Sequence, residues 1–351
     1  MTHLWVRAEQ RANETRVGIT PDGVAQLLQA GITVTVEASS TRCIATDAYA
    51  ATGAATAPEG SWPEAPADAI IFGLKELPDD GTPLRHRHIM FGHAFKGQPL
   101  GQILLRRFAA GGGTLYDLEY LVDDGGRRVA AFGYWAGYAG AAVALLAWAA
   151  QQRGQIAGPV DAYASANHML ADLQTALITA GAFRPTALII GALGRVGTGA
   201  ADLCTAMGVP TTKWDMAETA HGGPFPQVLT HDLFFNCILA RPGTPVFVPR
   251  SALTAPRKLS VIGDIACDPD SDFSPIKVYD RATTWAAPAL RVYDTPPLDV
   301  VAIDNLPSML PVESAEDYAE QLLPSLHTLT DLTAGVWGRA KAAFDRAMAT
   351  L

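Results

Sequence analysis

An apolar strand that runs directly into a glycine-rich turn constrains the fold of this chain most. Residues 188–190 are Leu-Ile-Ile, and Gly191, Gly194 and Gly197 follow at regular spacing. Apolar residues then recur at helical spacing through residues 196–207. Glycines in such a turn let the backbone approach a bound pyrophosphate, and the helix N-terminus offers it free N–H groups. The pattern predicts the strand–turn–helix unit of a dinucleotide-binding α/β domain.

An acidic residue beyond the next strand agrees with this interpretation. A strand predicted over residues 211–214 ends at Asp215, which lies 24 residues after Gly191. An acid about 20 residues past the first glycine is placed to bind the ribose hydroxyls. Because a carboxylate repels the 2′-phosphate of NADP, the sequence predicts NAD as the cofactor. A glycine-rich turn in a nucleotide-free domain is the alternative.

Strands alternate with helices along most of the 351 residues, in two series. A helix begins at Thr20 and Pro21, which are suited to its N-cap and first position. The first series has strands predicted over residues 4–8, 32–37, 69–73, 89–93 and 114–116, and the second over 186–190, 211–214, 233–238 and 260–264. Alternation of this kind predicts parallel sheets. We therefore expect an α/β fold with two Rossmann-like, doubly wound domains.

The expected domain boundaries follow from a largely helical C-terminal segment that we expect to return to the first domain. The substrate domain is predicted over residues 1–130 plus 320–351, and the dinucleotide-binding domain over 131–319. Residues 129–150 carry no charge and are long enough to span a bilayer. Gly133, Gly137 and Gly140 favour instead a buried helix over residues 136–152.

The composition of the chain restricts the kinds of partner and ligand that it is expected to bind. The formal net charge is −9, which is unlike the basic footprint of a nucleic-acid-binding protein. The four cysteines have no metal-ligand spacing, and the N-terminal segment is unlike a signal peptide. We expect a cytoplasmic protein with free thiols, no metal and a small-molecule substrate, with a disulfide between two cysteines left open. The oligomeric state stays unknown.

Ionisable side chains follow several predicted strands of the first domain, where ligands of α/β proteins bind. They are Lys75 and Glu76, His93 and Lys96, Glu119, Arg16 ahead of the first helix, and Arg127 with Arg128 ahead of the uncharged stretch. Each has a structural alternative. A Lys–Glu pair is often a surface pair, a histidine among aromatic residues can belong to the core, and adjacent arginines after two aspartates can form a solvated turn.

Several longer strings resemble one family. They are ETRVGITP at residues 14–21, GLKELP at 73–78, HAFK at 93–96, GTLYDLE at 113–119, GRRVAAFG at 126–133, IGALGR at 190–195, KWD at 213–215, GGPF at 222–225 and IDNLPS at 303–308. These strings span nearly the whole chain. The chain resembles the NAD-dependent, lysine-forming saccharopine dehydrogenases, within the alanine dehydrogenase and transhydrogenase superfamily.

This resemblance implies a two-domain oxidoreductase of amino-acid metabolism with a cleft between the domains. Lys75 and His93 match the acid–base pair of the family. Positions that line the cleft match Arg16, Lys96, Arg127 and Arg128, and their acidic partners match Glu76 and Glu119. The NAD site matches Gly191, Gly194, Arg195, Val196, Gly197 and Asp215, with Asp304 and Leu306 in a loop near the nicotinamide. The sequence departs from the family pattern at Val196, His221, Asn305 and Val312.

The chemistry of the family suits these residues. Saccharopine is a secondary amine with three carboxylates, so cations such as arginines suit its binding site. We hypothesise that Lys75, with its pKa lowered by neighbouring cations and burial, removes the ammonium proton, and that His93 activates water to attack the imine. The alternatives are a related amino-acid or opine-type dehydrogenase, such as an alanine dehydrogenase, and a non-catalytic NAD-binding protein.

Overall fold

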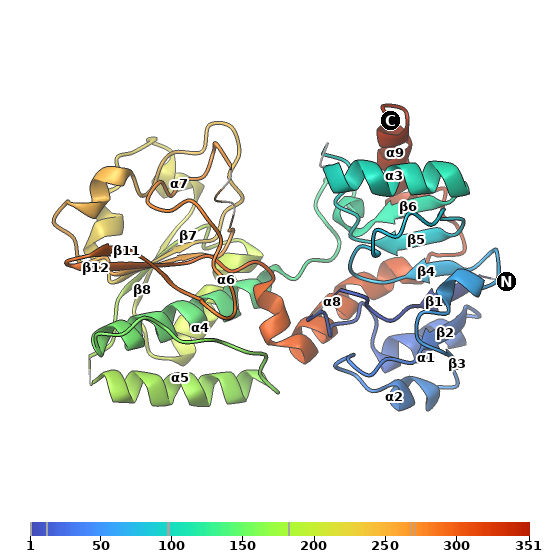
Figure 1. Cartoon of the computed structure of the whole chain (residues 1–351), viewed down its shortest axis with the longest axis horizontal. Helices are drawn as coiled ribbons and strands as arrows, with labels where there is room; N and C mark the ends of the chain where they lie inside the picture. Colours follow the sequence, from blue (N-terminus) through green and yellow to red (C-terminus); the bar gives the residue numbers. More distant parts are fainter. Residues whose placement is uncertain (1, 12, 97–98, 182, 268, 270) are drawn as a thin grey trace. The chain divides into compact units, whose positions relative to one another are not determined.

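The computed structural model describes residues 2–11, 13–96, 99–181, 183–267, 269 and 271–351. Its contacts divide the chain into one unit of Met1–Ala131 with Pro311–Leu351 and a second unit of Phe132–Leu310 (Figure 1). Each unit is a six-stranded, mainly parallel sheet with helices, so the predicted fold class is confirmed. The predicted cleft between the domains stays a prediction.

The chain returns to the first unit earlier than the sequence suggested. Helix α8 (Pro311–Leu326) is continuous and packs against α1 (Pro21–Gln29). Its buried side chains include Ala315, Tyr318 and Leu322, which recur at helical spacing. Because one buried face runs along the helix from Pro311 to Leu326, the return begins at Pro311 and not at residue 320.

The first sheet is parallel throughout and has the strand order β3-β2-β1-β4-β5-β6. Its strands are β1 (His3–Val6), β2 (Thr33–Glu37), β3 (Ala55–Ala57), β4 (Ile70–Phe72), β5 (Arg87–Met90) and β6 (Thr114–Asp117). The chain leaves β1 towards one edge and later returns to β4 on the other side. The gap between β1 and β4 is therefore the topological switch point, where doubly wound folds bind their ligands.

Helices and short turns complete the first unit. They are α1, α2 (Thr46–Ala50), α3 (Pro99–Gly111), α8, α9 (Gly335–Met348) and the 3₁₀ turns η1 (Trp62–Glu64) and η2 (Leu118–Tyr120). Thr20 caps α1 as predicted, because its side chain accepts a hydrogen bond from the Gly23 N–H at 3.2 Å. Helix α9 packs on β6 and on α3, so the C-terminal segment covers one side of this sheet.

The second sheet has the order β11-β12-β10-β9-β7-β8, and only β11 is antiparallel to its neighbour. Its strands are β7 (Ala187–Ile190), β8 (Thr211–Trp214), β9 (Leu233–Asn236), β10 (Val261–Asp264), β11 (Leu290–Asp294) and β12 (Pro297–Val301). Its helices and turns are α4 (Gly133–Gln152), α5 (Ala166–Ala180), α6 (Arg195–Ala206), α7 (Met216–Thr219), η3 (Pro226–Thr230), η4 (Arg250–Leu253) and η5 (Leu306–Met309).

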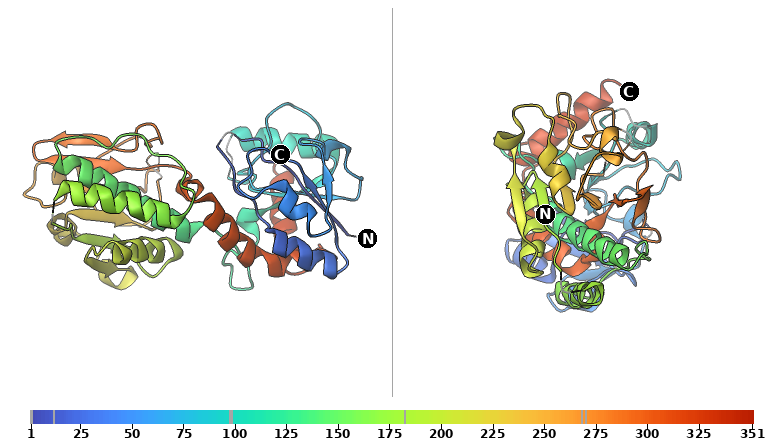
Figure 2. Two further views of the ribbon diagram at one scale, coloured as in Figure 1. Left: turned by 90° about the horizontal axis from the view of Figure 1, so that it is seen from below. Right: turned by 90° about the vertical axis from the view of Figure 1, so that its left-hand side faces the viewer.

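Successive side chains of a strand point to opposite faces of the sheet, and the second sheet therefore has a hydrophobic core on each face. Ile189 and Phe235 face the core formed with α4, α5 and α6, whereas Leu188 and Phe234 face the core on the other side. All four strand residues are fully buried, as expected for a parallel sheet covered on both faces. Helices α4 and α5 run side by side (Figure 2).

The uncharged stretch of the sequence forms α4, which is buried along most of its length. Its buried face packs against α5, α6 and strands of the second sheet. Among the described residues, no helix is both long and apolar enough to cross a membrane. The predicted helix is confirmed, and it begins three residues earlier than expected, at Gly133.

Helix α4 crosses α6 so closely that two glycines are needed at the contact. A Cβ atom at Gly137 would lie 1.8 Å from the Val196 carbonyl oxygen, and one at Gly199 would lie 1.9 Å from the Tyr134 carbonyl oxygen. Gly137→Ala should therefore lower the free energy of unfolding by about 1–3 kcal/mol, because backbone atoms must move apart. Denaturant unfolding would measure the loss, and Gly133→Ala is the control, since its nearest neighbour lies 3.2 Å away on the Arg195 side chain.

Some elements differ from the sequence prediction. Strand β5 ends at Met90, so His93 lies beyond the strand predicted over residues 89–93. Helix α5 was not predicted, although Met169, Leu173 and Leu177 recur at helical spacing and form its buried face. Helix α3 was not predicted either.

Candidate functional site

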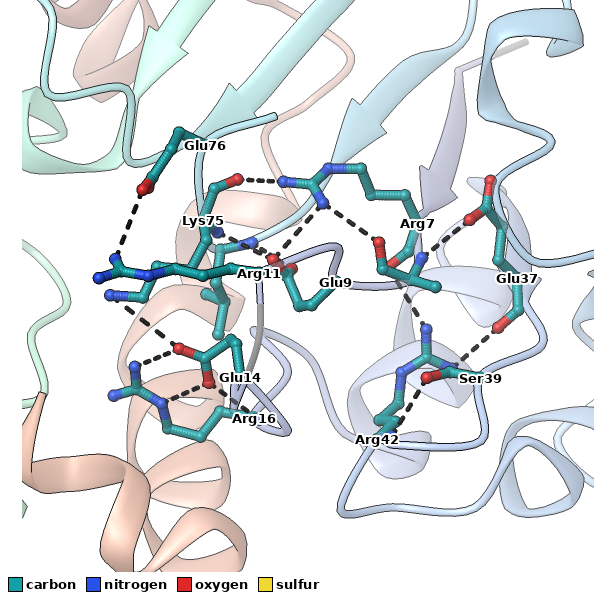
Figure 3. Close-up of polar contacts among 12 residues, drawn as sticks. Arg7, Glu9, Arg11, Glu14, Arg16, Glu37, Ser39, Arg42, Lys75 and Glu76 are labelled. Atoms are coloured by element: carbon teal, nitrogen blue, oxygen red, sulfur yellow. Dashed lines mark hydrogen bonds and ion pairs between the residues drawn. The ribbon is translucent and has the colours of Figure 1, made fainter. Parts of the chain in front are cut away.

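The switch point of the first sheet gathers charged side chains from three segments (Figure 3). Arg7 and Glu9 follow β1, and Lys75 and Glu76 follow β4, which pairs directly with β1. Glu14 and Arg16 come from the loop between β1 and α1. The carboxyl ends of neighbouring parallel strands meet at one edge, which explains why residues so distant in sequence come together.

Lys75 lies beside a buried ion pair. Its Nζ atom is 4.0 Å from Oε2 of Glu14. Arg16 binds the same carboxylate with two side-chain bonds, Nε to Oε1 at 2.8 Å and Nη2 to Oε2 at 2.5 Å. The side chains of Glu14 and Arg16 are 0% and 2% exposed, and that of Lys75 is 14% exposed. A basic nitrogen is thus held at the surface end of a desolvated pair of opposite charges.

Glu14 is a site residue that the sequence interpretation missed. Burial alone would raise its carboxyl pKa, but hydrogen bonds and charge from Arg16, together with the charge of Lys75, lower the pKa overall. Glu14 is therefore an anion beside Lys75, a neighbour that the sequence interpretation, with cations and burial around this lysine, did not include. The available signal was its place in the ETRVGITP string, two residues before Arg16.

His93 lies at the same sheet edge, after the neighbouring strand. The loops after β4 and β5 stay paired beyond the strands, because the Phe91 N–H donates to the Leu74 carbonyl at 2.9 Å. His93 is exposed, and its φ of 47° is unusual for a residue with a Cβ atom. Its ring stacks on Phe91 at 6.3 Å between centroids. It is therefore not a core histidine, and the structure brings it to the same end of the sheet as Lys75.

A cavity of about 340 Å³ opens beside His93. Glu76 lines it from the β4 end, and Leu100 and Leu104 line it from α3. The wall on the helix side is thus mostly apolar but includes Arg107, and the strand side carries ionisable groups. Glu76 pairs with Arg11, whose Nη1 atom lies 3.4 Å from Oε1 of Glu76.

A buried carboxylate fixes the loop that carries His93. Asp117 is 0% exposed and accepts hydrogen bonds from the Gly92 N–H at 3.2 Å and the Glu119 N–H at 2.9 Å. Burial raises the pKa of Asp117 to about 6, and the Glu119 charge adds to this effect. The two backbone bonds join the loop after β5 to the turn after β6.

The raised pKa of Asp117 predicts how it affects stability with pH. Since the folded pKa of about 6 exceeds the usual value of 3.8, the folded state binds more protons between these values. The contribution of Asp117 to stability is therefore complete below about pH 4 and is lost progressively as the pH rises from about 4 through 6, a change of about 3 kcal/mol. Unfolding the wild type and Asp117→Asn at pH 4–7 would measure it. A difference between the two proteins that does not change with pH would contradict it.

The remaining predicted substrate residues lie in two groups. Lys96 pairs with Glu119 at 2.9 Å, and this bond raises the pKa of Lys96. The charge of Arg128 acts on Lys96 in the opposite sense, so Arg128 lies near this pair. Arg127 instead forms a solvated turn with Asp123 at 3.5 Å, with its side chain 87% exposed. Within the first unit, Arg127 thus has the geometry of a solvated turn, and its role in substrate binding stays a prediction.

The glycine-rich turn has the geometry that a dinucleotide needs. Gly191 has a φ of 87°, and Gly197 packs so closely that a Cβ atom there would lie 2.1 Å from the Gly191 carbonyl oxygen. Gly194 is the N-cap of α6 and brings no side chain to cap it. Leu193, Gly194 and Arg195 are exposed, whereas Val196 packs partly into the core. The open helix N-terminus fits a pyrophosphate.

Asp215 fixes the turn from the adjacent strand. Its Oδ2 accepts the Leu193 N–H at 3.0 Å, and its Oδ1 accepts the Met216 N–H at 2.9 Å. Glu218 closes a capping box by accepting the Asp215 N–H at 2.7 Å. The carboxylate is partly exposed beside the turn, which is where a ribose hydroxyl would be expected.

The loop predicted to lie near the nicotinamide is ordered by its own contacts. Asp304 is exposed, and Asn305 adopts a φ of 64° and donates from Nδ2 to Ser308 Oγ at 2.8 Å. Leu306 is 2% exposed and belongs to the core against α4. Of the other departures from the family pattern, His221 packs on Phe225 with ring centroids 4.8 Å apart, and Val312 lies in α8.

Two further expectations concern metals and cysteines. Among the described residues, no three His, Cys, Asp or Glu side chains are grouped so that they could hold a metal ion. The four cysteines are free thiols, and Cys204 is buried.

Comparisons with known proteins agree with this architecture. The family model "Alanine dehydrogenase/PNT, N-terminal domain" matches residues 5–139. The solved structure of an L-alanine dehydrogenase superposes with a TM-score of 0.69 at 19% identity, covering 99% of this chain and 94% of that one. At this identity the likeness shows the fold alone.

Two curated relatives share far more sequence. A saccharopine dehydrogenase (NAD+, L-lysine-forming) of Candida albicans is 44% identical, covering 99% of this chain and 97% of the relative. Its namesake in Yarrowia lipolytica is 45% identical, covering 98% of this chain and 96% of the relative. Identity of this extent over both lengths confirms the resemblance found in the sequence, and the chain belongs to the family of NAD-dependent, L-lysine-forming saccharopine dehydrogenases.

Proposed function

We propose that this chain oxidises saccharopine with NAD, releasing lysine and 2-oxoglutarate in a reversible reaction. The observation that carries the proposal is the match to lysine-forming saccharopine dehydrogenases over nearly the whole of both chains. The Lys75–Glu14–Arg16 cluster at the switch point of the first sheet supports it, because a basic nitrogen there can serve as a proton acceptor.

Cations near this cluster suit a substrate with several carboxylates. Lys96 is bound to Glu119 at an exposed position, where an ion pair contributes little and can open for another anion. The Arg128 charge lies near it. Arg16 adds a planar guanidinium, the group best matched to carboxylates, although Glu14 already occupies one of its edges. We propose Lys96, Arg128 and Arg16 as the substrate-binding cations, and Glu76 and Glu119 as the acids that limit the net positive charge.

Lys75 is proposed to take the proton of the substrate ammonium, because carbon can release hydride only once the nitrogen lone pair is available. When bound, NAD supplies the hydride acceptor. The proton gained by Lys75 is stabilised by the Glu14 carboxylate 4.0 Å away. His93 is proposed to activate the water that attacks the resulting imine and then to return a proton as lysine departs. Water, saccharopine and NAD⁺ thus give lysine, 2-oxoglutarate, NADH and one proton.

The NAD site is proposed at Gly191, Gly194, Arg195, Val196, Gly197 and Asp215, with Asp304 and Leu306 in the loop on the nicotinamide side. The fit rests on the uncapped N-terminus of α6 and on the Asp215 carboxylate beside it. We also propose a cytoplasmic location, because the four cysteines show the pattern of free thiols in a reducing compartment.

The proposal is tested by following the oxidation of NADH through the loss of its absorbance. We expect turnover with lysine plus 2-oxoglutarate, and little with pyruvate plus ammonia. Turnover confined to pyruvate plus ammonia would indicate an alanine dehydrogenase instead. NADH binding without turnover on either pair would indicate a non-catalytic NAD-binding protein.

A further inference from the structure

The backbone of Lys75 is held by two residues that have no part in the chemistry proposed so far (Figure 3). Glu9 accepts hydrogen bonds from the Leu74 N–H at 2.6 Å and the Lys75 N–H at 3.0 Å, one with each carboxylate oxygen. Arg7 donates from Nη2 to the Lys75 carbonyl oxygen. Both polar groups of the Lys75 backbone are therefore satisfied by side chains that come from the other side of the switch point.

Arg7 and Glu9 also bind each other. Arg7 Nη1 lies 3.4 Å from Glu9 Oε2 and donates to the Ala8 carbonyl at 3.1 Å. Their side chains are 0% and 9% exposed. Hydrogen bonds that involve ionised groups are stronger than neutral ones, and burial removes the competition of water. The pair is thus a rigid support and not a mobile surface contact.

A glycine makes room for this arrangement. A Cβ atom at Gly73 would lie 2.4 Å from Arg7 Cζ, so the guanidinium occupies space that any other residue would fill. Gly73 continues the sheet, since its N–H donates to the Ile89 carbonyl at 3.0 Å. The backbone hydrogen bonds to the neighbouring strand therefore end just before Lys75. From Lys75 on, the side chains of Arg7 and Glu9 bind the backbone instead.

We propose that Arg7 and Glu9 are positioning residues, which fix the peptide of Lys75 so that its side chain extends to Glu14 and to the substrate. This inference rests on the proposed function, because it gives Lys75 a role in proton transfer. The two residues need not touch the substrate. Displacing a reacting group by about 1 Å can lower turnover about 10²-fold without weakening substrate binding.

The test compares Glu9→Ala and Glu9→Gln with the wild type. We expect Glu9→Ala to lower kcat about 10²-fold, with KM values for NADH and lysine within about twofold. Glu9→Gln keeps one acceptor oxygen but turns an NH₂ towards the second N–H, so its kcat should fall about tenfold. The Gln variant keeps the test valid if the Ala variant fails to fold.

The matched control is Asp232→Asn. Asp232 is a buried carboxylate that accepts the Thr186 N–H at 2.7 Å, just before β7 begins in the second unit. Its loss should lower stability and leave kcat within about twofold. A fall in kcat as large as in Glu9→Gln would mean that the Glu9 effect reflects general destabilisation, and would overturn the proposal.

A second measurement does not depend on turnover. Acetylation of Lys75 at pH 10, near the ordinary pKa of lysine, reports access to its amine. The side chain is 14% exposed, so release of its backbone in Glu9→Ala or Glu9→Gln should raise the labelling rate several-fold, measured by peptide mass spectrometry. An unchanged rate in both variants would overturn the positioning role. If the labelling rate rises in the variants but the wild type shows no turnover with lysine plus 2-oxoglutarate, the positioning role is upheld and the proposed function is rejected.

Discussion

Lys75→Met should lower turnover with lysine and 2-oxoglutarate by about 10²–10⁴-fold, the range expected when a general acid–base group is lost. Methionine fills a similar volume but cannot carry a proton, so Glu14 and Arg16 should keep their paired geometry. NADH affinity should stay within about twofold, because the proposed cofactor residues lie in the second unit. Steady-state kinetics and fluorescence titration of NADH would measure both quantities.

Two companion variants make this result decisive. His93→Gln should also lose most of its turnover while binding NADH, because glutamine can donate a hydrogen bond but cannot exchange a proton near neutral pH. Lys341→Met is the control, since Lys341 forms an exposed pair with Asp345 at 2.7 Å in α9 and should leave turnover unchanged. Near-normal turnover in both Lys75→Met and His93→Gln would reject the proposed acid–base pair.

Much of the fold could be predicted because local signals coincide with tertiary structure. The strand over Thr211–Trp214 was predicted with its observed bounds, and Thr20 and Pro21 occupy the predicted start of α1. Helix α5 was missed although its buried residues Met169, Leu173 and Leu177 recur at helical spacing, which is the signal of an amphipathic helix. The strand ending was misplaced at His93 because apolar residues continue to Phe91, after the ladder of β5 has stopped at Met90.

The sequence predicted which residues belong to the site better than it predicted which of these residues bind each other. Lys75 and His93 follow neighbouring strands, and this placement could be expected from the order of a doubly wound sheet. The partner of Lys75 could not, because Glu14 comes from a loop after a different strand. Likewise Arg7 reaches the Lys75 carbonyl across 68 positions of sequence, which no local pattern reports. The solvent exposure of a side chain could not be predicted from the sequence either, as the solvated turn of Arg127 shows.

Gly197→Ala should weaken NADH binding at least tenfold and lower the free energy of unfolding by about 1–3 kcal/mol. The added Cβ would lie 2.1 Å from the Gly191 carbonyl oxygen and 2.5 Å from the Ala192 Cα. Both are backbone atoms, so α6 must move away from the turn, and the N–H groups at its N-terminus move with it. Fluorescence titration and denaturant unfolding would measure the two losses.

A second variant, Gly194→Ala, separates the two expected effects of Gly197→Ala, which are weaker NADH binding and a lower free energy of unfolding. A Cβ there would lie 3.5 Å from the nearest atom, the Gly191 carbonyl oxygen, and the residue has an ordinary extended backbone with a φ of −79°. Its stability should therefore stay within about 1 kcal/mol of the wild type. NADH affinity should still fall, because the methyl group occupies space at the open end of α6 where the pyrophosphate is expected. If both alanine variants bound NADH as tightly as the wild type, the dinucleotide could not lie against this turn, and the acid at Asp215 would lose its proposed role as well.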